Sequence, residues 1–179
     1  MKRIDYAAIE LLVMDVDGVL TDGRIIIGPG GEDAKAFHVR DGAGMKYWKR
    51  AGRKLAIISG RPSQAVVHRA RELDVDAVKL QATDKLPAFL EVLAELNTRP
   101  DRTAVVGDDL PDLPLMQRCG FPVAVADAAA EVREAAAYVT KAAGGNGAVR
   151  EVVELILRQA GAWSDIMARY ARPDTEQVK

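Results

Sequence analysis

One stretch near the N-terminus decides the fold: Val13-Met14-Asp15-Val16-Asp17-Gly18-Val19-Leu20-Thr21-Asp22-Gly23. It continues an apolar run, residues 11–14, that is typical of a buried strand. Strand side chains alternate, so Asp15 and Asp17 are predicted to leave the strand on the same side. Like charges 4 Å apart repel by about 4 kcal/mol at an effective dielectric of about 20. Taken alone, the pair also suits a solvated strand end, but two carboxylates this close predict a cation between them.

The composition is that of one ordinary globular domain. The chain has 179 residues, of which 49% are hydrophobic and 28% charged, so residues 1–179 are predicted to form a single domain. The net charge of −1, without a long basic run, provides no electrostatic surface for nucleic acid or an acidic membrane. The composition therefore favours a small-molecule partner.

The sequence also indicates the compartment. The single cysteine, Cys119, excludes an intramolecular disulfide and suits a reducing environment. Glu10 interrupts any signal-peptide core, and no apolar stretch approaches the ~18 residues needed to cross a bilayer. We therefore expect a cytoplasmic protein.

Strand and helix patterns alternate along most of the chain. Such alternation with short connections predicts an α/β fold, a doubly wound parallel sheet with helices on both faces. Strands are expected at 11–14, 54–60, 76–80, 103–107, 122–126 and 138–140, and helices at 41–52, 63–73, 85–97, 112–120, 128–137 and 148–159.

Two segments lie outside this alternation. Two β-prone runs around a Gly/Pro-rich turn predict a β-hairpin at 24–39, which needs a partner surface from its own domain or from another subunit. The C-terminal tail, 161–179, has apolar residues at helical spacing from Trp163 to Tyr170 and then polar residues that should fray. This tail is a candidate to reach a neighbouring subunit's site.

Polar side chains gather where the predicted parallel strands end. Ligands of open α/β sheets bind beyond these carboxyl ends. Acids for a metal, a hydroxyl donor and a lysine together suit a tetrahedral dianion such as a phosphoryl group. The residues in question are Asp15, Asp17, Ser59, Lys85, Asp108, Asp109 and Asp112.

Four of these stretches resemble the motifs of the haloacid dehalogenase superfamily of phosphohydrolases, in order and in spacing. They are Asp-Val-Asp-Gly-Val-Leu-Thr-Asp (15–22), Ile-Ile-Ser-Gly-Arg (57–61), Lys85 and Gly-Asp-Asp-Leu-Pro-Asp-Leu-Pro (107–114). The closer similarity is to the 3-deoxy-D-manno-octulosonate 8-phosphate phosphatase family and to sialic-acid-type 9-phosphate phosphatases. Phe37-His38-Val39-Arg40-Asp41-Gly42 and Gly144-Gly145-Asn146-Gly147-Ala148-Val149-Arg150-Glu151 resemble signatures of that family.

The resemblance implies a two-step hydrolysis at the acidic pair. Asp15 would attack phosphorus and form an aspartyl-phosphate, and Asp17 would protonate the leaving oxygen and later deprotonate water. Mg²⁺ would be held by the carboxylates of Asp15 and Asp108 and by the backbone carbonyl of Asp17. Gly18 would let the backbone turn sharply beside the metal.

The remaining residues receive supporting roles from the same resemblance. Ser59, with Gly60, would bind the phosphoryl oxygens, and Lys85 would neutralise the charge that builds up on them. Asp112 would orient either Lys85 or a metal-bound water, and Asp109 would support the metal ligands.

The spacing between the motifs indicates what can cover the site and so which substrates it accepts. Only 41 residues separate Asp17 from Ser59, and the hairpin and one helix fill them, so no cap domain is expected. The hairpin is the available cover, and the resemblance implies a homotetramer in which neighbouring subunits wall each other's sites. Arg61 is the first candidate for the carboxylate of a sugar acid, because its planar fork matches a carboxylate, and Lys79 is the second.

Several alternatives remain open at this point. The substrate is expected to be 3-deoxy-D-manno-octulosonate 8-phosphate, with a nine-carbon nonulosonate 9-phosphate as the alternative. A phospho-accepting receiver domain shares the Asp, Ser and Lys set, but its acidic pair is adjacent instead of Asp-x-Asp, and a non-catalytic scaffold is the other class. His38 and His68 are expected to be structural or on the surface, and residues 144–147 are expected to form a flexible loop.

Overall fold

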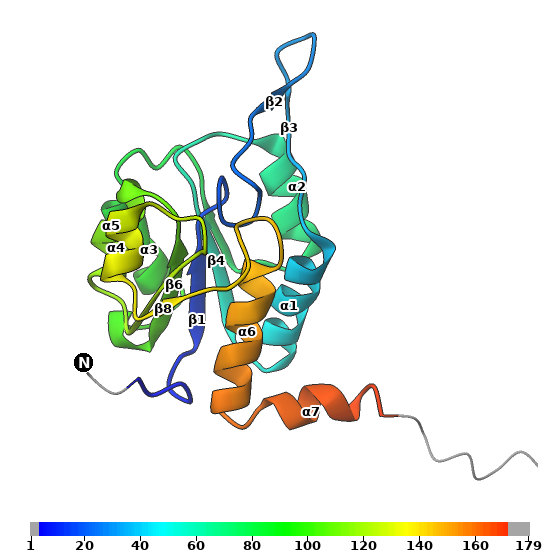
Figure 1. The fold of residues 1–179 in the computed structure, drawn as a ribbon, viewed down its shortest axis with the longest axis vertical. Coiled ribbons are helices and arrows are strands. Elements are labelled where there is room, and N and C mark those ends of the chain that lie inside the picture. Colours follow the sequence, from blue (N-terminus) through cyan, green and yellow to red (C-terminus); the bar gives the residue numbers. More distant parts are fainter. Residues whose placement is uncertain (1–3, 172–179) are drawn as a thin grey trace, which may run out of the picture.

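A computed structural model describes residues 4–171 of the chain. Its main feature is a six-stranded parallel sheet in the order β5-β4-β1-β6-β7-β8 (Figure 1). The strands are β1 (Leu11–Met14), β4 (Lys54–Ile58), β5 (Ala77–Lys79), β6 (Thr103–Gly107), β7 (Phe121–Ala124) and β8 (Tyr138–Val139). Every residue of β1 is buried, as expected for a central parallel strand covered on both faces.

Helices cover both faces of this sheet. Figure 1 shows α1, α2 and α6 on one side and α3, α4 and α5 on the other, which confirms the doubly wound α/β prediction. Their bounds are α1 (Val39–Arg50), α2 (Gln64–Glu72), α3 (Lys85–Glu95), α4 (Leu113–Met116), α5 (Ala130–Ala135) and α6 (Ala148–Gln159). Within residues 4–171, none of the helices is long and apolar enough to cross a membrane.

The strand order places a topological switch point between β1 and β6. The chain runs from β1 outward to β4 and β5, and then returns to β6 on the other side of β1. Adjacent loops diverge at such a point and leave a crevice at the carboxyl ends of the two strands. The residues that follow these ends are Asp15 and Asp108.

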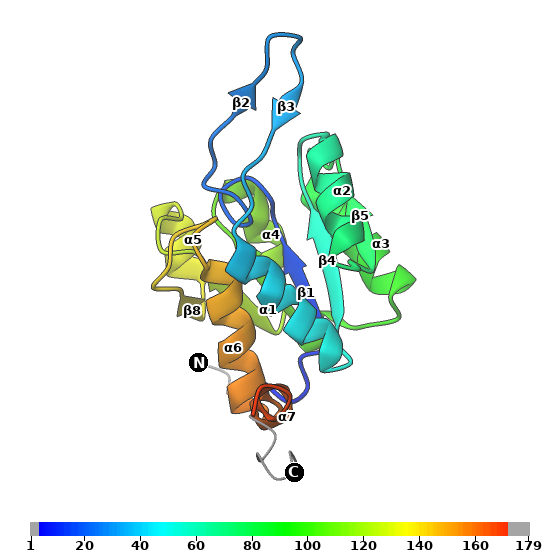
Figure 2. The same ribbon diagram turned by 90° about the vertical axis from the view of Figure 1, so that its right-hand side faces the viewer.

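The predicted hairpin exists but is short. Only β2 (Ile26–Ile27) and β3 (Asp33–Ala34) pair, in antiparallel register, because the Gly/Pro-rich loop occupies the middle of the segment. The hairpin projects away from the sheet and its helices (Figure 2). Ile25, Ile26 and Ile27 are 56%, 48% and 69% exposed, so the described chain does not itself cover these side chains.

Two other segments differ from the predictions. The helix expected at 112–120 is a 3-10 turn, Leu110–Asp112, followed by the one-turn α4. The segment turns away from a helical path before Gly120, whose N–H donates to the carbonyls of Pro100 (2.8 Å), just before β6, and of Thr103 (3.0 Å), its first residue. The tail from 161 is not free at its start, since α7 (Trp163–Ala168) packs on α6 and buries Trp163. The fraying tail predicted beyond it lies outside the described residues.

Candidate active site

A cleft with about 740 Å³ of empty volume lies at the carboxyl ends of the central strands. It collects nearly all of the polar residues that the sequence singled out, from the ends of β1, β4 and β6 and from the start of α3. The residues that line it are Asp15, Asp17, Ser59, Gly60, Arg61, Ala82, Thr83, Lys85, Asp108, Asp109, Pro111 and Asp112.

Asp15 and Asp17 both face this cleft, which confirms the alternation argument. The Asp15 N–H donates to the carbonyl of Val106 (3.2 Å), so the strand pairing extends up to the first carboxylate. Gly18 then turns the backbone with a φ of +96°, and a Cβ at this position would lie 2.0 Å from Asp108 Oδ2. Glycine is therefore required here for two reasons, the left-handed backbone and the space that Asp108 occupies.

Lys85 joins two of the carboxylates. Its Nζ lies 2.9 Å from Asp15 Oδ1 and 2.7 Å from Asp112 Oδ1, and its side chain is only 5% exposed. Burial by itself lowers the pKa of Lys85, but the charges of Asp112 and Asp15 outweigh burial and raise it. Lys85 is thus a fixed positive charge beside Asp15.

Asp108 completes a compact group of acids. Carboxylate oxygens of Asp15, Asp108 and Asp112 lie within 4.8 Å of one another. Burial, followed by the charge of Asp15 and then that of Asp112, raises the pKa of Asp108 from 3.8 to about 8. Burial, followed by the charge of Asp112, raises the pKa of Asp15 to about 6, although Lys85 opposes the shift.

This group fits a divalent cation. Asp108 Oδ1 is buried and has no hydrogen-bond partner among residues 4–171. Both Asp112 oxygens are engaged, one with Lys85 and the other with the Asp108 N–H (3.1 Å). The carboxylates of Asp15 and Asp108 are hard oxygen ligands of the kind that Mg²⁺ prefers, and a cation would offset both the burial and the mutual repulsion that raise their pKa values.

Ser59, Gly60 and Arg61, which follow β4, line the same cleft. Ser59 is buried, and its Oγ accepts a hydrogen bond from the Arg61 N–H (3.4 Å). The Arg61 side chain is half-exposed, and its Nε lies 3.9 Å from Asp17 Oδ2. Lys79, the second candidate for a substrate carboxylate, lies outside the cleft lining and pairs with Glu91 (3.3 Å) and Glu95 (3.2 Å) on α3.

One residue near the acidic pair, Lys35, is not predicted by the sequence patterns above. This hairpin residue reaches back to Asp17, with which its Nζ forms an ion pair and hydrogen bond, and its side chain is only 4% exposed. Strand alternation puts Asp33 and Lys35 on one side of the hairpin, which is the only sequence signal available. Nothing in the local pattern shows that this side meets the loop after β1.

Residues 144–147 form the loop expected before α6, and two of its glycines, Gly144 and Gly145, are closely packed. A Cβ on Gly144 would lie 1.7 Å from the carbonyl oxygen of Gly18, and one on Gly145 would lie 2.3 Å from the backbone of Thr21. The Gly145 N–H also donates to the carbonyl of Val19 (2.9 Å). The loop therefore supports the backbone that carries the acidic pair.

Asp41 fixes the same loop from the other side. It is 2% exposed, and its carboxylate accepts hydrogen bonds from the N–H groups of Gly147 (3.1 Å) and Arg150 (2.7 Å). The start of α1 is thereby tied to the start of α6.

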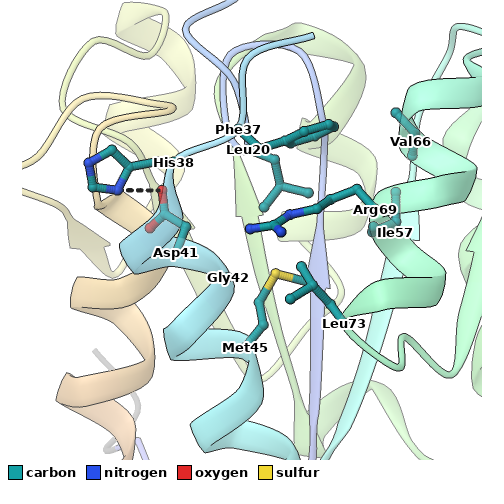
Figure 3. Close-up of a pocket in the computed structure, with 10 residues that line it drawn as sticks. All are labelled: Leu20, Phe37, His38, Asp41, Gly42, Met45, Ile57, Val66, Arg69 and Leu73. Carbon is teal, nitrogen blue, oxygen red and sulfur yellow. Dashed lines mark ion pairs between the residues drawn. The ribbon is translucent and has the colours of Figure 1, made fainter.

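A second pocket lies beside the base of the hairpin, between α1 and α2 (Figure 3). Its lining is mostly apolar, with Arg69 extending from α2 toward α1. His38 Nδ1 lies 3.9 Å from Asp41 Oδ2. His38 thus lies outside the acidic cleft, and His68 is exposed on α2, as expected of residues that the chemistry does not need.

Comparison with known proteins places the chain in a family. Residues 78–152 match a model for haloacid dehalogenase-like hydrolases. The 3-deoxy-D-manno-octulosonate 8-phosphate phosphatase of Escherichia coli K12 is 46% identical over 153 residues, which cover 86% of this chain and 81% of that protein. The chain belongs to this phosphatase family.

Solved structures agree with that assignment. The 3-deoxy-D-manno-octulosonate 8-phosphate phosphatase from Moraxella catarrhalis, in complex with magnesium, phosphate and KDO, is 41% identical and has a TM-score of 0.89. The match covers 92% of this chain and 95% of that chain. A probable YrbI family phosphatase from Pseudomonas syringae is 43% identical with a TM-score of 0.91, covering 94% and 96%. The family and the α/β fold that the sequence predicted are thereby confirmed, and the magnesium of the Moraxella catarrhalis complex agrees with the kind of cation predicted for the acidic pair.

Proposed function

We propose that this protein hydrolyses 3-deoxy-D-manno-octulosonate 8-phosphate to the free sugar acid and phosphate. The observation that carries the proposal is the cleft itself: a candidate nucleophile, a second carboxylate, a buried lysine and acids that could hold a cation lie together at the switch point of the sheet. The 46% identity to phosphatases of this name supports the choice of substrate. A nine-carbon sugar acid phosphate is the alternative.

The first step forms an enzyme-bound phosphoryl group. Asp15 attacks phosphorus in line, a bond from its carboxylate oxygen to phosphorus forms, and the bond to the sugar oxygen breaks. Asp17 gives its proton to that oxygen as it leaves. Lys85, which touches Asp15 directly, stabilises the negative charge on the phosphoryl oxygens, and Ser59 donates a hydrogen bond to them.

The second step returns the enzyme to its starting state. Asp17 takes a proton from water as the water oxygen attacks phosphorus, and the bond to Asp15 breaks with release of phosphate. Asp15 and Asp108, with the backbone carbonyl of Asp17 that the resemblance implies, would hold Mg²⁺, which would supply positive charge between the carboxylates and the phosphoryl group. Asp112 holds Lys85 in place, and Asp109, exposed at the rim, supports the loop of Asp108.

Specificity comes from the rim of the cleft. Arg61 lines the cleft beside Asp17 and Ser59, so its guanidinium can bind the carboxylate of the sugar acid. Gly60, between Ser59 and Arg61 in the chain, has no side chain and so leaves room for the phosphoryl group. The receiver domain that the sequence left open disagrees with the 46% identity to phosphatases, and Asp17 supplies the acid and base that turnover needs.

We assign the active form as a cytoplasmic homotetramer in which hairpins of neighbouring subunits cover the sites. The apolar hairpin surface at Ile25, Ile26 and Ile27 supports the assembly, because exposed apolar patches mark interaction sites. The single cysteine supports a reducing compartment.

Phosphate release from a panel of sugar phosphates, measured with Mg²⁺ and with a chelator, tests the function. We expect Mg²⁺-dependent turnover of the eight-carbon sugar acid phosphate, and Asp15→Asn should reduce it by more than about 1,000-fold, because no phosphoryl acceptor remains. Asp22→Asn, an exposed acid in the same loop, is the control and should stay active. Hydrolysis of no substrate by the wild type, or full activity of Asp15→Asn, would contradict the proposal.

A further inference from the structure

Lys35 is an unusual residue for an exposed hairpin. The isoleucines of the hairpin are about half or more exposed, whereas the Lys35 side chain is only 4% exposed. Burying an ammonium group is costly unless charged partners compensate for the lost hydration. The position of Lys35 therefore depends on the acids that it contacts.

Those acids are Asp17 and Asp33. The Lys35 Nζ forms an ion pair and hydrogen bond with Asp17 Oδ1 and lies 3.8 Å from Asp33 Oδ2. Asp33 Oδ2 is buried and has no hydrogen-bond partner in the described part of the chain. Its charge therefore helps to balance that of Lys35, while the hydrogen bond of Lys35 goes to Asp17. Asp17 is the direct partner.

The contact fixes one side of the Asp17 carboxylate. Oδ1 is held by Lys35 from the hairpin, and Oδ2 lies 3.9 Å from Arg61 Nε. Lys35 does not line the cleft, and no ion pair joins it to Asp15, Asp108 or Asp112 among residues 4–171. Any effect of Lys35 on the reaction must therefore pass through Asp17.

We propose that Lys35 is a positioning residue that holds Asp17 in the orientation for proton transfer, so that the hairpin carries part of the reaction's machinery for its own subunit. The proposal rests on the function proposed above, in which Asp17 protonates the leaving oxygen. An aspartate side chain has several staggered rotamers, and an acid displaced by about 1 Å loses much of its effect. The hairpin therefore affects proton transfer by Asp17 as well as access to the site.

A double-mutant cycle tests this coupling. The variants are Lys35→Met, Asp17→Asn and the double variant, assayed for kcat/KM on the eight-carbon sugar acid phosphate with Mg²⁺. We expect Lys35→Met to lower kcat/KM by about 10- to 100-fold, part of the 10²- to 10⁴-fold that general acid catalysis contributes. In the Asp17→Asn background the same substitution should change kcat/KM by less than about 3-fold, since residues that act through one another are not additive. Independent, multiplicative losses would overturn the proposal.

The leaving group gives a second readout. A nitrophenyl phosphate needs little protonation of its leaving oxygen, and kcat/KM excludes the later hydrolysis of the aspartyl-phosphate that all substrates share. Lys35→Met should therefore spare the aryl phosphate and impair the sugar phosphate. Equal losses on both substrates would show a merely structural role and would refute the positioning role.

A matched control separates folding from positioning. Lys49 also pairs with two aspartates, Asp76 (2.5 Å) and Asp74 (4.0 Å), at the far end of α1. Lys49→Met should keep full activity on both substrates, and light scattering should give the same mass for all variants. Failure of the wild type to hydrolyse any sugar phosphate would instead refute the proposed function, so the two failures are distinguishable.

Discussion

The surroundings of Asp108 lower the free energy of unfolding but suit the function of this site. Its carboxyl is buried beside Asp15 and Asp112, and one oxygen has no hydrogen-bond partner among residues 4–171. These surroundings raise its pKa to about 8, so the ionised form is unfavourable without a cation. Functional sites commonly contain groups whose burial would be avoided elsewhere in a protein.

The stability of the metal-free protein should therefore depend on pH. The folded-state pKa of Asp108 is raised above 3.8, so the folded protein binds this proton more tightly than the unfolded chain does. The resulting stabilisation is fully present below about pH 4 and is lost as the pH rises toward 8. We expect Asp108→Asn to raise the Tm of the metal-free protein by about 2–8 °C at pH 8 and to change it little near pH 4.

Thermal unfolding with a chelator measures this difference, and Mg²⁺ should stabilise the wild type but not Asp108→Asn. The same substitution should abolish Mg²⁺-dependent phosphate release. A lower Tm for Asp108→Asn at pH 8 would contradict the unfavourable ionisation of this buried carboxyl.

The glycine-rich loop before α6, residues 144–147, supports the backbone turn that follows Asp15 and Asp17. Gly144 and Gly145 pack directly on the backbone of residues 18–21, and Asp41 holds the end of the loop at Gly147. Any side chain in this contact would push on the turn after β1. The position of α6 therefore affects, through this loop, where the side chains of Asp15 and Asp17 lie.

Gly144→Ala tests this arrangement. The added Cβ meets a backbone carbonyl at 1.7 Å, and backbone atoms cannot move aside cheaply. We expect a loss of about 1–3 kcal/mol of folding free energy, a Tm lower by about 2–12 °C, and reduced kcat at temperatures where the protein stays folded.

Gly52→Ala is the control for this substitution. Gly52 also has a positive φ, +75°, but a Cβ there meets nothing within 4 Å. It should cost about 1 kcal/mol of folding free energy and leave kcat unchanged. Equal kcat for both variants would contradict the role of the loop.

At the scale of the whole molecule, the active site is open. The described chain carries no cap domain, and the hairpin extends away from the sheet with its isoleucines exposed (Figure 2). Water exclusion strengthens the electrostatic interactions on which phosphoryl transfer depends, so a cover from other subunits would increase activity. Assembly and catalysis are expected to depend on the same hairpin.

The double substitution Ile25→Asp and Ile27→Asp should dissociate the proposed tetramer into single chains. Both side chains lie on one face of the hairpin by strand alternation, and a charge in an apolar interface is strongly unfavourable. We expect light scattering to show a fall from four chain masses to one, with turnover reduced. Leu90→Asp, at an equally exposed apolar position on α3, should leave the mass unchanged. A wild-type protein that is monomeric and fully active would disprove the proposed tetramer.

Sequence patterns alone predicted the sheet, its helices apart from the length of the one expected at 112–120, and most of the cleft. Apolar runs and their period are local properties, and the carboxyl ends of parallel strands must meet at one edge, so Asp15, Ser59 and Asp108 were found from spacing. Lys85 was found from its place in an ordered set of motifs, and the structure brings it to within 2.9 Å of Asp15.

Only the tertiary structure decided the contacts between segments far apart in the chain. The Lys35 contact with Asp17 depends on how the hairpin folds back, and the fit of Gly144 against Gly18 depends on two backbones that meet across the molecule. Local patterns contain no information on such approaches, because packing of the whole core sets them. For the same reason the structure removed Lys79 from the site, since α3 supplies Glu91 and Glu95 as its partners.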